Sequence, residues 1–155
     1  MADRARLPTI GPLLWYRDPR AAIAWLEKAF GFECRILVEG EGGSVMHSEL
    51  ALGDGYIMVV GPPTFPNSRS PLDLDGCHTA SVHIQLAEGI EAHYARARAA
   101  GAEINRELAE QPYGDTVYTC RDLEQHPWSV GQTTKVMSTS EMEAATGHKV
   151  TGAAG

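Results

Sequence analysis

The chain contains 155 residues, 43% of them hydrophobic, and carries a formal net charge of −7. This length suits a single globular domain, and the acidic balance argues against non-specific binding to nucleic acid, which requires a basic surface. No apolar run approaches the roughly 20 residues that span a bilayer. The N-terminal sequence MADRARLP is not followed by a hydrophobic segment, so we expect no secretory signal and a cytoplasmic location.

The first half of the chain predicts four strands and one helix. Residues 10–16 (IGPLLWY) form a short apolar strand. Asp18 is a good N-cap residue, Pro19 suits the first helical position, and Gly31 is placed to end the helix. The helix is expected to bury one apolar face, formed by Ala22, Ile23, Leu26, Ala29 and Phe30. Three further strands are predicted at residues 32–39, 44–52 and 56–61, the last two joined by a GDG hairpin turn.

The second half predicts the same order of elements. A strand at residues 80–86 precedes a helix whose buried face includes Ile90, Tyr94 and Ala97 and which ends at Gly101. Three more strands are predicted at residues 103–108, 115–120 and 127–132.

An internal repeat relates the two halves. Gly31 matches Gly101 and Gly61 matches Gly131, each at an offset of 70 residues. A constant offset across separated segments indicates two copies of one structural unit. We therefore predict a single domain over residues 1–132, made of a first module (7–61), a Pro- and Ser-rich linker (62–76) and a second module (77–132). The remaining residues, 133–155, form a tail that is either a short helix capped by Ser140 and Glu143 or disordered.

Three segments carry a resemblance to a known family. YRDPRAAIAWLEKAFGFE, VMHSELALGDGYIMV and QPYGDTVYTCRDLEQHPWSVG resemble the vicinal-oxygen-chelate superfamily, which includes glyoxalase I, extradiol dioxygenases, fosfomycin-resistance enzymes and bleomycin-resistance proteins. They look most like its PhnB-like, glyoxalase-like group, and the resemblance covers residues 8–132. It implies an α+β fold in which two βαβββ modules form a cup-shaped, incomplete mixed-sheet barrel, with the helices outside and the site inside.

Alternation along the strands separates a helix-covered face from an open face that would line the cup. The helix-covered face is predicted to hold Leu14, Tyr16, Met58, Val60, Val82, Ile84, Leu86, Trp128 and Val130. The open face is predicted to hold Gly11, Leu13, Trp15, Ile57 and Val59 from the first module, and Ser81, His83, Gln85, Pro127 and Ser129 from the second. The cup would have one apolar and one polar wall, which suits an amphipathic or aromatic ligand.

The resemblance also places four positions at which metal-dependent relatives carry His or Glu ligands. The equivalent residues here are Gly11, Val59, Ser81 and Ser129. A shift of one residue in the register of the fourth strand would bring Met58 to the place of Val59. None of these side chains is a strong ligand for a divalent cation. We therefore predict neither a metal ion nor another cofactor.

Several residues on the open face are candidates for contact with a ligand. His83 and Gln85 lie among apolar neighbours, where an unsatisfied polar group is costly, so they either bond each other to close the barrel or orient a ligand. Trp15 is either a core aromatic or a stacking surface for a planar ligand. Tyr113, in the loop QPYGD, either overhangs the mouth of the cup or belongs to an ordinary turn.

Two residues are candidate acid–base groups if the protein is an enzyme. Glu49 and His83 are the candidates for a general base, and His47 shares a face with Glu49. A place on the surface or in a dimer interface is the alternative for His47 and Glu49. His126 is expected in the turn before the last strand, where this chain reads DLEQH instead of the family's DPEGH.

We therefore predict a small-molecule-binding protein without a bound metal ion, comparable to a bleomycin-resistance protein, and we expect it to be a homodimer. Its predicted ligand-binding residues are Leu13, Trp15, His47, Val59, Ser81, His83, Gln85, Tyr113 and Ser129. The alternative is a glyoxalase-like lyase or isomerase with relocated metal ligands or a Glu or His base. We expect no nucleic-acid partner and no membrane partner.

Overall fold

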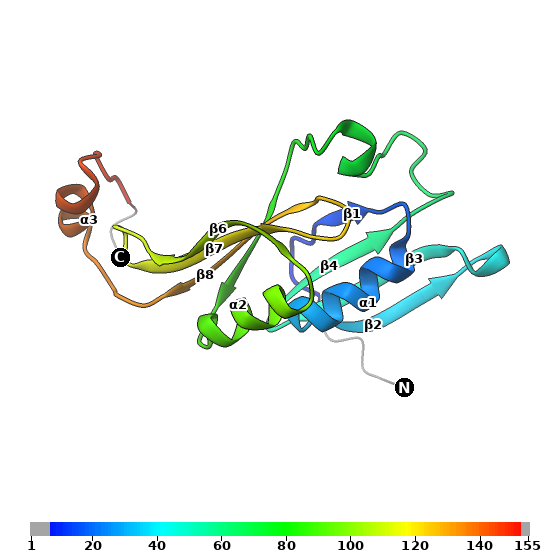
Figure 1. Ribbon diagram of the computed structural model, residues 1–155, viewed down its shortest axis with the longest axis horizontal. Coiled ribbons are helices and arrows are strands. Elements are labelled where there is room, and N and C mark those ends of the chain that lie inside the picture. Colours follow the sequence, from blue (N-terminus) through cyan, green and yellow to red (C-terminus); the bar gives the residue numbers. More distant parts are fainter. Residues whose placement is uncertain (1–6, 153–155) are drawn as a thin grey trace.

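The computed structural model describes residues 7–152, which form two four-stranded sheets and three α-helices (Figure 1). The first module comprises β1 (Leu13–Trp15), α1 (Pro19–Phe30), β2 (Glu33–Glu39), β3 (Val45–Leu52) and β4 (Gly55–Val60). The second comprises β5 (Val82–Leu86), α2 (Ile90–Ala99), β6 (Glu103–Glu110), β7 (Asp115–Arg121) and β8 (Pro127–Thr133). A third helix, α3 (Thr139–Thr146), follows in the tail.

The two sheets have the same topology. Sheet A has the strand order β1-β4-β3-β2, and sheet B repeats it as β5-β8-β7-β6. The pairs β1/β4 and β5/β8 are parallel, and the other pairs are antiparallel. Each module is therefore a βαβββ unit, and the two sheets remain open instead of joining in a closed barrel. The predicted α+β architecture is confirmed.

Local sequence signals explain the limits of α1. The Asp18 carboxylate accepts a hydrogen bond from the Ala21 amide at 3.0 Å, and Pro19 occupies the first turn, where its missing N–H costs nothing. Gly31 ends the helix at φ = 85°, a left-handed conformation that a glycine adopts without steric cost. These residues act as the sequence predicted.

The helices cover one face of each sheet, and the strand register corrects one predicted face. Leu14 pairs with Val59, which is fully buried beneath α1, and Ile57 on the same side of β4 is 3% exposed. The prediction that Ile57 and Val59 line the open face is wrong, and Met58 and Val60 lie there instead. The segment 57–60 is apolar at every position, so the sequence contains no alternation from which to choose a face.

The two modules share one core. In Figure 1, α1 and α2 lie side by side, and the Trp25 indole N–H donates to the Ala100 carbonyl oxygen at 2.9 Å. The Phe30 ring, at the end of α1, meets the Trp128 ring of β8 edge-on, with 5.0 Å between the ring centroids. Both rings are essentially buried. The modules are therefore parts of one packed unit.

His93 on α2 ties the second helix to the end of the first. Its Nε2 lies 3.1 Å from the Phe30 carbonyl oxygen, its Nδ1 lies 2.8 Å from the Tyr118 hydroxyl, and its ring stacks on Phe30. A neutral imidazole suits both contacts, since Nε2–H can donate while Nδ1 accepts. Burial lowers the pKa of His93 below its ordinary value, and the nearby Arg96 guanidinium lowers it further.

We expect this burial to make the protein sensitive to acid. Because the pKa of His93 is lower in the folded than in the unfolded chain, the unfolded chain binds more protons at acidic pH. Neutral His93 contributes its full stabilisation above the pKa of histidine in the unfolded chain, near 6.5, and this contribution is lost as the pH falls below that value. Urea unfolding of wild type and His93→Gln at about pH 7.5 and 5.5 measures this. The variant should lose less stability than the wild type between the two pH values, and equal losses would contradict the assignment.

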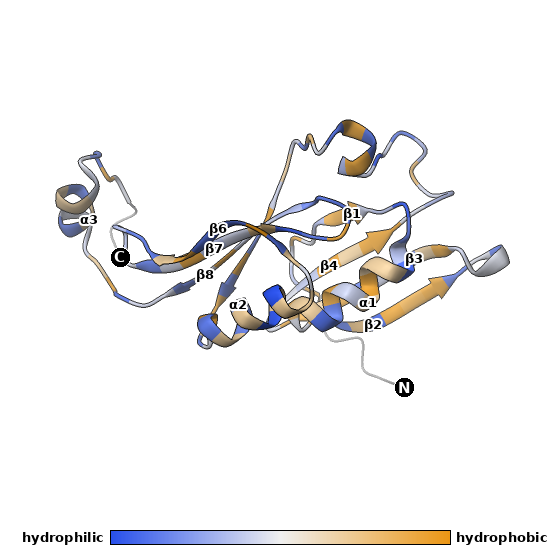
Figure 2. Ribbon diagram, viewed as in Figure 1, coloured by the Kyte–Doolittle hydropathy of each residue, from blue (hydrophilic) through white to orange (hydrophobic). Residues whose placement is uncertain are grey.

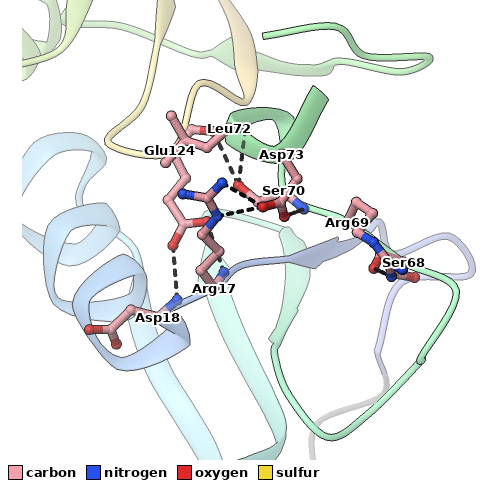
Figure 3. A network of polar contacts seen from close by, with 8 residues as sticks. All are labelled: Arg17, Asp18, Ser68, Arg69, Ser70, Leu72, Asp73 and Glu124. Carbon is pink, nitrogen blue, oxygen red and sulfur yellow. Dashed lines mark hydrogen bonds and ion pairs between the residues drawn. The ribbon is translucent and has the colours of Figure 1, made fainter. Parts of the chain in front are cut away.

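The loop between β7 and β8 holds the start of α1. Figure 3 shows the Glu124 carboxylate at the backbone amides of Arg17 and Asp18, which donate to it at 2.8 and 2.9 Å. Arg17 also reaches the linker, where its Nε donates to Asp73 at 2.8 Å. Glu124 is 5% exposed, so a buried carboxylate of the second module satisfies free N–H groups of the first.

The tail contains a helix. Ser138 caps α3, accepting from the Glu141 amide at 3.2 Å, while the Glu141 side chain accepts from the Ser138 amide. The predicted cap at Ser140 and Glu143 is wrong by two residues, because both pairs have the same spacing and only the chain path selects one. None of the helices within residues 7–152 is long and apolar enough to cross a membrane.

Candidate functional site

Four polar side chains form a continuous hydrogen-bonded row on the open face of sheet B, which we call the polar ladder: Ser129, His83, Gln85 and Thr133. The Ser129 hydroxyl lies 3.0 Å from His83 Nδ1, and His83 Nε2 lies 2.8 Å from the Gln85 side-chain oxygen. The Gln85 amide nitrogen donates to the Thr133 hydroxyl at 3.1 Å. Residue pairing in the parallel β5/β8 register places His83 directly beside Ser129.

The orientation of the Gln85 amide sets the direction of hydrogen-bond donation along the polar ladder. The Gln85 amide nitrogen faces Thr133, so the amide oxygen faces His83 Nε2, which must carry the hydrogen. His83 Nδ1 is then the acceptor, and the Ser129 hydroxyl donates to it. Gly131 lies beneath this contact, and a Cβ there would be 3.2 Å from both Gln85 Oε1 and His83 Cε1. The predicted mutual bonding of His83 and Gln85 is therefore present, and both side chains remain exposed.

The open face of sheet A is mainly apolar. Leu13 pairs with Met58, which pairs in turn with Glu49, so the three side chains lie in one row. In Figure 2, hydrophobic colouring is extensive on β4, whereas β6 carries much more hydrophilic colouring. On this face Met58 takes the position that the sequence predicted for Val59.

Glu49 is enclosed although it points to the open side. It is 6% exposed, and its carboxylate lies 3.1 Å from Nε2 of His47, its neighbour on β3. A pocket of about 280 Å³ is lined by Glu49, Arg35 and Tyr56, among others. The structure therefore brings Glu49 and His47 together on sheet A, but it places His83, the other candidate base, on sheet B.

A second pocket lies between β1 of sheet A and the start of β5 and β8 of sheet B. It has a volume of about 210 Å³ and is bordered by Leu13 of β1, by Ser81 just before β5 and by Pro127 of β8. Trp15 lies one pleat further along β1, and its indole N–H donates to the Thr64 carbonyl oxygen of the linker at 2.9 Å. This contact holds the ring in place, so Trp15 has a structural role whether or not it also stacks on a ligand.

Tyr113 lies at the opposite end of sheet B from this pocket. It is 41% exposed in the turn between β6 and β7, next to Gly114, whose carbonyl oxygen accepts from the Lys135 amide at 2.9 Å. Thr133, the last member of the polar ladder, pairs with Asp115 just after this turn. Tyr113 is therefore close in the fold to the Thr133 end of the ladder, not to Ser81.

The positions that the resemblance equates with metal ligands do not form a metal site here. With Met58 in place of Val59 on the open face, they are Gly11, Met58, Ser81 and Ser129. A Cβ at Gly11 would lie 2.2 Å from Cζ of Tyr56, so the tyrosine ring fills the space of a side chain at that position. Within residues 7–152, no group of three or more His, Cys, Asp and Glu side chains is arranged to hold a metal ion. The residues present do not fit a divalent cation.

Sequence reasoning did not identify the role of Asp122. Its carboxylate is 3% exposed and accepts from the Tyr16 hydroxyl at 2.6 Å and from the Trp128 indole N–H at 3.0 Å. Burial, followed by the negative charge of Asp122, raises the pKa of Tyr16 well above its ordinary value, so the hydroxyl stays a donor. His126 lies in the loop as predicted, and its Nε2 is 2.9 Å from the Trp15 carbonyl oxygen.

Comparison with known proteins identifies the family. The family model described as Glyoxalase/Bleomycin resistance protein/Dioxygenase superfamily matches residues 7–130. The chain belongs to this superfamily. Among curated proteins, it is similar to the uncharacterized protein Mb0911c of Mycobacterium bovis, with 28% identity over 89% of this chain and 91% of the relative.

Solved structures of superfamily members have the same fold. TioX from Micromonospora sp. ML1 is 28% identical, with a TM-score of 0.62 over 80% of this chain and 98% of that one. The fosfomycin resistance protein FosX from Listeria monocytogenes is 12% identical, with a TM-score of 0.60 over 87% of this chain and 97% of that one. At 12% identity the likeness to FosX shows the fold alone.

Proposed function

We propose that the protein binds an amphipathic or aromatic small molecule without a metal ion, at the pocket between β1 and the start of β5 and β8. The observation that carries the proposal is the presence of glycine, methionine and two serines at the four positions that the resemblance equates with His and Glu metal ligands. Leu13 and Pro127 supply apolar contacts there, and Ser81 supplies a hydroxyl group for hydrogen bonding. A site with one apolar and one polar wall recognises ligands of mixed polarity.

Dye binding tests the position of this site. The fluorescent dye 8-anilinonaphthalene-1-sulfonate has an aromatic body and a charged end, so it should bind the pocket. Ser81→Phe should weaken its binding about tenfold or more, because the ring fills part of a pocket of about 210 Å³. Ser140→Phe, an exposed serine on α3, is the matched control and should leave binding unchanged. Equal affinities of the wild type and Ser81→Phe would refute the assigned position.

Elemental analysis tests the absence of a bound metal. Protein purified without chelators should contain far less than one Ni, Zn, Fe or Mn ion per chain. A stoichiometric ion would contradict the proposal, whereas it would leave the fold and the family assignment untouched.

We further propose that two copies of the chain associate. The open face of sheet A exposes apolar side chains, since Leu13 is 38% and Val38 47% exposed. A second copy is the partner expected to cover them, because apolar patches on a soluble protein commonly mark interfaces. Light scattering should then give twice the chain mass of 16.8 kDa. A mass of one chain at micromolar concentration would contradict a homodimer.

A second candidate function is a glyoxalase-like lyase or isomerase. It is favoured by the enclosed position of Glu49, 3.1 Å from His47 and beside a pocket of about 280 Å³. A carboxylate in such a place can act as a general base. This candidate predicts turnover of a glyoxal–thiol adduct that Glu49→Gln abolishes without changing the far-ultraviolet circular dichroism. The binding proposal predicts no turnover in either protein.

A further inference from the structure

We propose that Ser129 is a nucleophile activated by the His83 imidazole, and that sheet B therefore accepts acyl groups from activated esters. This activity goes beyond the binding function proposed above and does not depend on it. A serine hydroxyl is a weak nucleophile alone and needs an adjacent base that is itself held in orientation by a third group. The first three members of the polar ladder provide that arrangement.

The distances satisfy the geometric requirement. Ser129 Oγ lies 3.0 Å from His83 Nδ1, and Gln85 Oε1 lies 2.8 Å from His83 Nε2. Both separations lie within the range of about 2.6–3.2 Å expected for a nucleophile–base and a base–orienter pair. The three residues come from adjacent parallel strands, β5 and β8, so the sheet holds their backbones in register.

Gln85 positions the base. Its amide nitrogen is bonded to Thr133 at 3.1 Å, so only its oxygen can face the imidazole. That oxygen requires the hydrogen of His83 to be on Nε2 and leaves the basic lone pair of Nδ1 directed at Ser129. The opposite tautomer would place two acceptors, Nε2 and the Gln85 oxygen, against each other. Gln85 thus acts through His83 and does not itself contact a substrate.

The surroundings of Ser129 allow access to its hydroxyl group. Ser129 is half-buried and His83 is exposed, so an ester and water reach the hydroxyl from the open side of the sheet.

The chemical steps balance. The Ser129 oxygen attacks the ester carbonyl carbon while His83 Nδ1 takes the hydroxyl proton. The carbonyl π bond re-forms, the bond to the leaving oxygen breaks, and His83 returns the proton to that oxygen, releasing an alcohol or phenol. The acyl group is then an ester of Ser129. A water molecule, deprotonated by His83, hydrolyses this ester and restores the hydroxyl and the neutral imidazole.

Acetylation by p-nitrophenyl acetate tests the proposal. Intact-mass and peptide analysis of the wild-type chain should show one acetyl group on Ser129, formed together with p-nitrophenol. Ser129→Ala should lose this adduct and slow nitrophenol release about 100-fold, a typical contribution of assisted nucleophilic attack. Ser140→Ala, which removes an exposed serine of α3, is the matched control and should react like the wild type.

Two variants of Gln85 separate positioning of the base from a structural role. Gln85→Leu removes the acceptor and should slow acetylation about tenfold or more, since an unoriented imidazole is a poorer base. Gln85→Glu restores an oxygen acceptor for His83 Nε2–H and should recover the rate. Acetylation of Ser129→Ala at the wild-type rate, or equal rates in the leucine and wild-type proteins, would overturn the proposal. Dye binding by the same variants reports separately on the proposed binding function.

Discussion

Replacing Asp122 with alanine is expected to lower the free energy of unfolding by about 3–5 kcal/mol. The carboxylate accepts four hydrogen bonds in a buried position: from the Tyr16 hydroxyl, the Trp128 indole and the backbone amides of Glu124 and His126. Alanine leaves these donors without an acceptor, and a buried unsatisfied donor costs about 1–3 kcal/mol. Chemical denaturation followed by circular dichroism measures the change.

Two further variants make this result interpretable. Asp122→Asn preserves the side-chain volume but offers one acceptor oxygen where two are used, so we expect it to lose a large part of the stability lost by alanine. Asp54→Asn changes an exposed carboxylate in the β3–β4 hairpin of the first module, and should stay within about 0.5 kcal/mol of the wild type. If the free energy of unfolding of Asp122→Ala lies within about 1 kcal/mol of the wild-type value, the carboxylate does not hold the two modules together.

Truncating Phe30 to alanine should also lower the free energy of unfolding by about 3–5 kcal/mol. The ring is 1% exposed, and its centroid lies 5.0 Å from that of the Trp128 ring and 5.6 Å from that of the His93 ring. It therefore packs against β8 and α2 of the second module. Alanine would leave a cavity that this packing cannot refill. Because the modules share this core, unfolding should remain a single transition at a lower denaturant concentration.

An exposed phenylalanine provides the control for this prediction, and the number of unfolding transitions tests the shared core. Phe65 is 51% exposed in the linker, and Phe65→Ala should change the free energy of unfolding by about 0.5 kcal/mol or less. Two separate transitions in the Phe30→Ala protein would show that the modules unfold independently. That result would contradict a shared core, even if the loss of total stability matched the expected value.

The sequence alone determined the elements and their order, because the signals involved are local. Asp18, Pro19 and Gly31 set the limits of α1 through hydrogen bonds and dihedral angles that depend on neighbours in the chain. Alternation of polar and apolar residues also placed His83, Gln85 and Ser129 on the open face, since each lies between apolar residues that need burial. The offset of 70 residues then paired the modules and led to the fold.

Contacts between distant residues were decided only by the tertiary structure. Val59 and Met58 lie in an apolar run, so their faces depend on the register with β1 and β3, which no local pattern encodes. Tyr16 and Asp122 are 106 positions apart, and their hydrogen bond exists because the modules pack together. Thr133 likewise completes the polar ladder by bonding Gln85 across 48 positions. The local sequence determines whether a segment forms a helix or a strand, whereas the contacts of a side chain depend on how the whole chain packs.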